Sequence, residues 1–246
     1  MRIVRSAADL AAVQNRSAMG LVLVMEGGEP LIDDPARVRT FSDRGVRAIM
    51  LTHARDSALG GSGSPSIPGT NVYLRADRGL SDLGRAVLGE MAQVGMILDL
   101  AHASPATFHD ALAAWSGPVM VSHGACAALY PSRRNLSDDQ LRAIADRGGV
   151  VGIFVQTQFL GGTHLRSVAD HIIHAVEVAG AKHVGLGLDM EEVTTGVLPA
   201  ELQTARDLPK LTALLADRDL PPEVIEDVLG RNFLRFFATS LPARGS

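Results

Sequence analysis

The chain has 246 residues, of which 46% are hydrophobic, with a single cysteine and a formal net charge of -4 at pH 7. This charge, without any basic run, argues against nucleic acid or an anionic membrane surface as a partner, because both attract basic proteins. The lone Cys126 cannot form an intrachain disulfide, and no apolar stretch reaches the roughly 18 residues of a membrane span, so a soluble, cytoplasmic protein is expected.

Short apolar runs recur along the chain, and a longer amphipathic stretch follows each of them, which predicts parallel β-strands covered by helices. The predicted strands are residues 21–25, 46–51, 96–100, 119–121, 150–155 and 184–188. This order and length are typical of an α/β protein of the (β/α) TIM-barrel type, but six strands cannot close a barrel of eight. We therefore predict a single domain over residues 1–246 with an incomplete barrel.

Helix signals stand between these strands, as serines at the expected N-caps and glycines at the expected C-termini. Ser81 precedes a predicted helix over 82–94, Ser104 with Pro105 precedes 106–115, and Ser137 with Gln140 forms a capping box before 141–147. The glycines expected to end helices are Gly45, Gly95, Gly148, Gly149 and Gly180.

Two irregular stretches follow strands directly, at 55–78 and 190–198, and we interpret them as loops over an active site. The tail over 207–238 is predicted to be wholly helical, with one helix opening at Pro221-Pro222 and another joined at Arg231-Asn232.

Five ionisable residues come just after predicted strands, where the strand ends of a barrel meet at its catalytic face. They are Glu26, His53, His102, His123 and Asp189. Any one of them alone has about a one-in-five chance of function, because a polar residue there is usually a cap or turn former. Imidazoles and carboxylates together suit zinc or a similar divalent ion, whose bound water is a nucleophile at neutral pH.

The remaining histidines that we considered lack this placement and are predicted to pack or to face solvent. They are His109, His164, His171, His174 and His183.

Several segments carry a resemblance to a known family. They are Met25-Glu26-Gly27-Gly28, Gly45-Val46-Arg47 running to Leu51-Thr52-His53, residues 95–102, Val121-Ser122-His123, Ser132-Arg133-Arg134-Asn135 with Asp138-Asp139, residues 183–189 and residues 231–235. In order and spacing they closely resemble the renal (membrane) dipeptidase family, over nearly the whole chain. The resemblance implies a two-zinc barrel that hydrolyses dipeptides.

The resemblance also implies metal-binding roles for four residues. Glu26 matches the glutamate that bridges the two metals, and His102 and His123 match the histidines that bind one of them. Asp189 matches the ligand of the other metal, which is also a candidate proton shuttle.

Two further residues match groups that contact the substrate. His53 resembles the oxyanion donor for the tetrahedral intermediate, and Arg134 the arginine that binds the substrate's terminal carboxylate, which a planar guanidinium can grip bidentately. Without the resemblance, an ordinary surface arginine in a loop is the simpler interpretation of Arg134.

One part of the family pattern is missing. The family's first strand carries a His-x-Asp pair that supplies two ligands of one metal, and this chain has no histidine before His53. Glu26, His102 and His123 still give one metal three protein ligands, so we expect one zinc ion rather than two, unless another chain supplies the missing pair.

The same gap predicts open sheet edges at 21–25 and 184–188, which a second copy or a separately encoded partner chain could cover. It also leaves three hypotheses open. The chain is a metal-dependent hydrolase of a dipeptide or a related small amide, a weak or inactive relative that binds a ligand or partner, or a truncated product of a longer reading frame.

Overall fold

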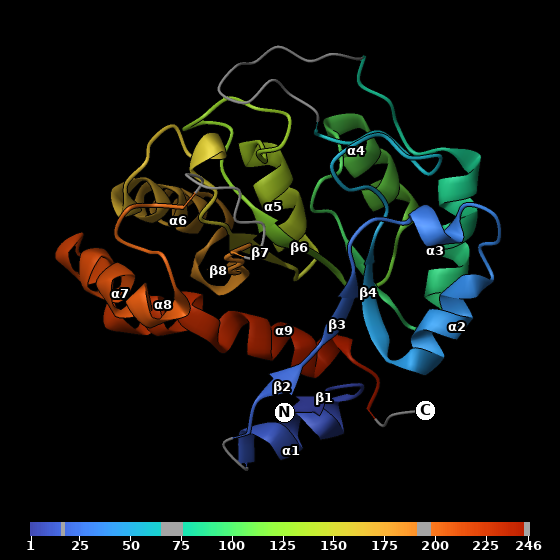
Figure 1. Ribbon diagram of the computed structural model, residues 1–246, viewed down its shortest axis with the longest axis horizontal. Helices are drawn as coiled ribbons and strands as arrows, with labels where there is room; N and C mark the ends of the chain where they lie inside the picture. Colours follow the sequence, from blue (N-terminus) through green and yellow to red (C-terminus); the bar gives the residue numbers. More distant parts are fainter. Residues whose placement is uncertain (16–17, 65–75, 191–197, 244–246) are drawn as a thin grey trace. The chain divides into compact units, whose positions relative to one another are not determined.

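The computed structural model describes residues 1–15, 18–64, 76–190 and 198–243 (Figure 1). Its main sheet has the neighbour order β3-β4-β5-β6-β7-β8. The strands are β3 (Leu23–Met25), β4 (Val46–Met50), β5 (Ile97–Asp99), β6 (Val119–Gly124), β7 (Val150–Ile153) and β8 (Val184–Leu186). Each overlaps one of the six predicted strands, and β3 to β6 pair in parallel, as do β7 and β8. Among the described residues β3 and β8 are not paired with each other, which confirms the incomplete barrel.

A second sheet of two short parallel strands was not predicted. It consists of β1 (Arg2–Ile3) and β2 (Gly20–Leu21). Leu21 pairs with Ile3 instead of joining the main sheet, so the predicted strand 21–25 is divided between two sheets.

The helices follow the predicted order. They are α1 (Ala7–Asn15), α2 (Arg37–Arg44), α3 (Asp82–Gln93), α4 (Pro105–Ala114), α5 (Asp138–Asp146), α6 (Leu165–Ala179), α7 (Leu208–Asp217), α8 (Pro222–Glu226) and α9 (Asn232–Ser240). Short 3-10 turns η1 (Glu29–Leu31), η2 (Thr157–Phe159), η3 (Ala181–His183) and η4 (Ala205–Asp207) and the π-helical η5 (Asp227–Arg231) complete the list.

The predicted serine caps are confirmed. The hydroxyls of Ser81, Ser104 and Ser137 each accept a hydrogen bond from the backbone N–H three residues on. Ser137 and Gln140 form the reciprocal capping box, and α5 begins at Asp138 rather than at residue 141, because the glutamine of a capping box lies inside the first helical turn.

Gly45 ends α2 in a left-handed conformation, with a φ of 105° and its N–H bonded to Phe41 and Ser42 carbonyls. Gly95, Gly148 and Gly180 also have positive φ, whereas Gly149 does not.

The tail is not wholly helical as predicted. Residues 218–221 separate α7 from α8, and Asp219 there has a φ of 61°. A proline disfavours helical backbone in the residue before it, and Pro221 therefore interrupts the helix before α8 starts at Pro222, where a start was predicted.

Contacts divide the chain into two compact units. Of the described residues, unit 1 comprises 1–15, 18–64, 76–120 and 234–243, and unit 2 comprises 121–190 and 198–233, so that the division falls within β6. In unit 1, α2 and α3 lie side by side next to β4 and β5 (Figure 1), over a core that includes Ile49, Val87 and Leu98.

In unit 2, α5 and α6 cover β7, and α6 also packs against β8 and α7. The core of this unit includes Ile144, Val151 and Ile172, all fully buried. Within the described ranges of the chain, no helix is both long and apolar enough to cross a membrane.

Candidate metal centre

Backbone pairing sets the positions of three predicted histidines along neighbouring strands. Met50 of β4 pairs with Asp99 of β5, and Asp99 pairs with Met120 of β6. His53, His102 and His123 each follow one of these paired residues by three positions. The register of the sheet therefore gives them equivalent places at the carboxyl ends of consecutive strands.

Glu26 is the first residue after β3, and two glycines shape the turn that follows it. Gly27 has a φ of 90°, and a Cβ there would clash with the Glu29 carboxylate and lie 3.3 Å from His53 Cβ. A Cβ on Gly28 would clash with the Leu59 side chain. The Glu-Gly-Gly sequence thus allows the chain to turn directly beside the end of β4.

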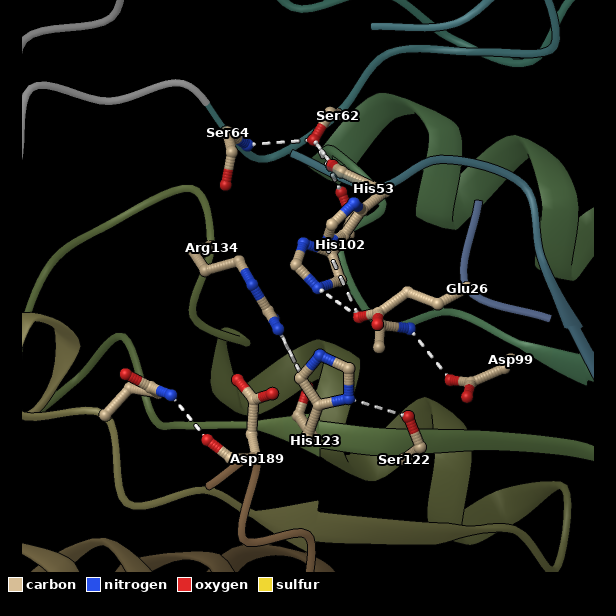
Figure 2. Close-up of polar contacts among 12 residues, drawn as sticks. Glu26, His53, Ser62, Ser64, Asp99, His102, Ser122, His123, Arg134 and Asp189 are labelled. Carbon is tan, nitrogen blue, oxygen red and sulfur yellow. Dashed lines mark hydrogen bonds and ion pairs between the residues drawn. The ribbon is translucent and has the colours of Figure 1, made fainter. Parts of the chain in front are cut away.

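Within unit 1, two imidazoles face the carboxylate of Glu26 (Figure 2). Its Oε1 lies 3.1 Å from His102 Nε2 and 3.6 Å from His53 Nε2. The His53 and His102 rings are arranged edge to face, with their centroids 4.7 Å apart. The His102 side chain is 11% exposed, against 41% for Glu26, so the nitrogen and oxygen donors meet at an accessible edge. Zinc accepts this mixture of donors.

His102 has an unusual backbone conformation, with a φ of 64°. A left-handed conformation costs a non-glycine residue on the order of 1 kcal/mol. Neighbouring hydrogen bonds support it, because Asp99 Oδ1 accepts from Ala101 N at 3.0 Å and Leu100 O accepts from Ala103 N at 3.2 Å. Strain of this kind is concentrated at functional sites.

In unit 2, His123 lies in β6 and is 7% exposed. Its Nδ1 is 2.9 Å from the hydroxyl of Ser122 (Figure 2). In the tautomer in which Nδ1 donates this bond, Nε2 carries the lone pair that a metal requires, and such outer partners orient metal-binding histidines. The role of Ser122 was not predicted, although a hydroxyl residue directly before the candidate ligand was visible in the sequence.

Arg134 is not the surface arginine of the simpler interpretation, because only 5% of it is exposed. Both terminal nitrogens of its guanidinium donate to the main-chain oxygen of His123, at 3.3 Å each. The guanidinium also lies over the ring of Phe154, 5.2 Å from its centroid. The structure thereby joins two of the predicted site residues in unit 2.

Asp189 follows β8 and also has a left-handed backbone, with a φ of 53°. Its main-chain oxygen accepts a hydrogen bond of 2.5 Å from the side-chain amide of Gln156. Gln156 was missed in the sequence, yet it is the polar residue directly after the predicted strand 150–155, the same placement that identified the five candidates.

Of the two histidines on α6 that were expected to have a solvated or packed surface role, His171 is instead buried. His171 is 1% exposed on α6, with Nδ1 accepting from Cys126 N at 2.9 Å and Nε2 donating to Leu160 O at 3.3 Å. Burial lowers the pKa of His171 to about 4 and raises the pKa of the Cys126 thiol to about 12, so both are neutral at pH 7.

Comparison with known proteins identifies the relatives of the chain. A family model described as membrane dipeptidase (peptidase family M19) matches residues 1–242. An uncharacterized dipeptidase of Schizosaccharomyces pombe is 34% identical over 232 residues, covering 92% of this chain and 54% of the relative. The dipeptidase aclJ of Aspergillus oryzae is 33% identical over 219 residues, which cover 87% of this chain and 50% of the relative. The chain spans about half the length of these curated relatives.

Solved structures share the fold. A dipeptidase described as an M19 metallopeptidase has a TM-score of 0.87 at 24% identity, covering 98% of this chain and 71% of its own. A metallopeptidase from Rhodobacter sphaeroides was solved with a bound phosphinate mimic of the dipeptide L-Ala-D-Ala. It has a TM-score of 0.86 at 24% identity, and the match covers 97% of this chain and 68% of that structure's chain. Nearly all of this chain therefore superposes on part of a longer α/β fold.

Proposed function

The chain belongs to the membrane dipeptidase family, peptidase family M19, and on this premise we propose that it hydrolyses a dipeptide or a related small amide with the help of a bound divalent metal. The observation that carries the proposal is the approach of His102 Nε2 to Glu26 Oε1, 3.1 Å apart at the ends of two strands. Relatives that are named dipeptidases support the substrate class.

We propose that Glu26, His102 and His123 hold the metal. Within unit 1, Glu26 Oε1 and His102 Nε2 lie 3.1 Å apart. Two imidazoles and a carboxylate are a ligand set that zinc accepts. The equivalent strand positions of His102 and His123 support the same set.

Three protein ligands favour one ion in this chain, with a position left for water. A second ion would retain Glu26 and Asp189 as ligands and would need further ligands beyond these two. Among the described residues no strand pairs with the outer side of β3, so a further chain could pair with this edge. The predicted open edge at 184–188 is covered instead, because η5 packs against β8 and Asn232 Nδ2 donates to Val184 O at 2.6 Å.

We assign the steps of amide hydrolysis to the metal and to three residues. A bound divalent ion supplies Lewis acidity and lowers the pKa of its water. Asp189 accepts the proton of the attacking water and passes it to the leaving amine as the C–N bond breaks. His53 donates a hydrogen bond to the oxyanion that forms on the carbonyl, and Arg134 binds the terminal carboxylate of the substrate.

The missing His-x-Asp pair favours a second candidate function, that of a weak or inactive dipeptidase-like protein that binds a ligand. The two functions differ in turnover rather than in metal binding, since the ligands of one metal are present in both.

The proposed function is tested by measuring zinc per chain and dipeptide hydrolysis, with and without added zinc, in the wild type and in two histidine variants. His123→Ala is expected to lose the metal and the hydrolytic activity. Because a ligand is removed, the loss should exceed the roughly 10–100-fold decrease in metal affinity or activity that follows loss of an outer-sphere partner. His109→Ala, a control at an exposed histidine on α4, should keep both.

Unchanged turnover in His123→Ala would contradict the assigned ligands. Zinc binding by the wild type without hydrolysis would favour the ligand-binding alternative, and about two ions per chain would show that further ligands exist.

A further inference from the structure

The hydroxyl of Ser62, in the loop after β4, contacts the main chains of two proposed site residues. Ser62 Oγ lies 2.5 Å from the main-chain oxygen of His53 and 3.2 Å from that of His102 (Figure 2). A hydroxyl has one proton, so His53 O is the principal acceptor and His102 O shares the donor. Ser62 is 8% exposed, which shields these bonds from water.

The backbone of the same loop holds Ser62 and the turn that carries His102 together. Gly63 N donates to His102 O at 2.7 Å, and Ser62 forms an antiparallel bridge with Ala103. Ser62 N donates to Asp56 Oδ1 at 2.9 Å, and Ser62 Oγ accepts from Ser64 N at 3.0 Å. The hydroxyl is thereby fixed in place from both sides.

We infer that Ser62 is a positioning residue for metal binding, which sets the spacing of the His53 and His102 backbones and holds His102 in its left-handed conformation. The inference rests on the proposed metal site at Glu26 and His102. The orientation of an imidazole depends on the backbone from which it projects, and groups outside the ligand sphere commonly tune metal affinity in this way.

Ser57 provides a matched control in the same loop. It is also 8% exposed, its Oγ donates to Leu51 O at 3.1 Å, and it accepts from the N–H of Leu59 at 3.1 Å. Each serine hydroxyl thus donates to a main-chain carbonyl and accepts from the backbone N–H of the residue two positions later in the sequence. They differ in that the acceptor of Ser57 is a core leucine at the end of β4, whereas the acceptors of Ser62 are site histidines.

The test compares Ser62→Ala with Ser57→Ala in the full chain. The Kd for Zn²⁺ is measured by competition with a chelator, the visible spectrum of the Co²⁺-substituted protein reports ligand geometry, and urea unfolding reports the stability of the metal-free protein. Ser62→Ala should raise the Kd by about 10–100-fold and alter the Co²⁺ spectrum. Ser57→Ala should leave Kd and spectrum near the wild type, even where it lowers stability.

Ser62→Thr keeps the hydroxyl and is expected to bind Zn²⁺ more tightly than Ser62→Ala. Equal effects of Ser62→Ala and Ser57→Ala on the Kd, or equal Kd values for Ser62→Ala and Ser62→Thr, would overturn the inference while leaving the metal site intact. A wild type that takes up no zinc would overturn the proposed site, and the role of Ser62 with it.

Discussion

The guanidinium of Arg134 has two sets of contacts that bear on function. It holds the main-chain oxygen of His123 through both terminal nitrogens, and it lies against Phe154. Burial keeps the planar group in one orientation, which favours bidentate recognition of a carboxylate over mere charge attraction. A lysine would keep the charge at this position and lose the fork.

Arg134→Lys is expected to raise the KM for a dipeptide by about 10–100-fold, since a hydrogen bond to a charged group contributes roughly 1.5–3 kcal/mol. The measurement compares kcat and KM for a dipeptide and for its C-terminal amide, which has no carboxylate. The penalty should shrink for the amide. An equal penalty for both substrates would show that Arg134 acts through His123 alone.

On the scale of elements, α6 is tied to the loop after β6 by the buried imidazole of His171. Its Nδ1 must be unprotonated to accept from Cys126 N, and burial lowers its pKa from 6.5 to about 4. Between pH 6.5 and 4 the unfolded chain binds a proton at this residue that the folded protein does not. The contribution of His171 to the free energy of unfolding is therefore fully present above pH 6.5, and it decreases as the pH falls toward 4.

The loss attributable to His171 is on the order of 3 kcal/mol across this range. His171→Asn keeps an acceptor near the position of Nδ1 and has no titrating group, so its free energy of unfolding should depend less steeply on pH. Urea unfolding at pH 7.5 and pH 5 checks this, with His109→Asn at an exposed position as the control. Parallel pH profiles for the wild type and His171→Asn would contradict the assignment.

The elements themselves were largely predictable, because their signals are local. Ser81, Ser104 and Ser137 cap the helices that they were predicted to open, and Gly45 ends α2 as expected. The break at residues 218–221 was missed, although the charged run Asp217-Arg218-Asp219 interrupts the apolar pattern and the pair of prolines marked the next helix start.

Candidate site residues that directly follow a strand could be identified from the sequence pattern. The contacts of candidate residues in loops could not. The strand-end rule placed Glu26 and His102 at the ends of two strands of the same sheet, β3 and β5, and their side chains meet there. The burial of Arg134 and the contacts of Ser62 depend on how loops fold back onto the sheet, and no periodicity in the sequence encodes that path.

On the scale of the whole molecule, the prominent feature is the unpaired edge of the main sheet at β3. Within the described part of the chain, β3 has a neighbour on one side only, and its Val24 is 36% exposed. An exposed apolar edge strand readily pairs with another chain. This is the physical basis for our proposal that a second copy or a partner chain covers the edge at β3.

Sedimentation velocity over a range of concentrations is expected to show self-association of the purified chain. Val24→Lys should weaken it, because a charged residue on an edge strand opposes pairing. His109→Lys, at an exposed helix position, serves as the control for added charge. A monomer at every concentration would contradict pairing between copies and leave a different partner chain as the alternative.

The left-handed backbone of His102 has a consequence for the divergence of related sequences. Glycine would occupy this position without steric cost, and under the proposed function histidine is retained there for its imidazole. Selection for a stable fold and selection for metal binding therefore act in opposite directions on one codon. A relative released from catalysis would be free to drift to glycine or asparagine at this position, so the residue found there is an indicator of whether a lineage still relies on the chemistry.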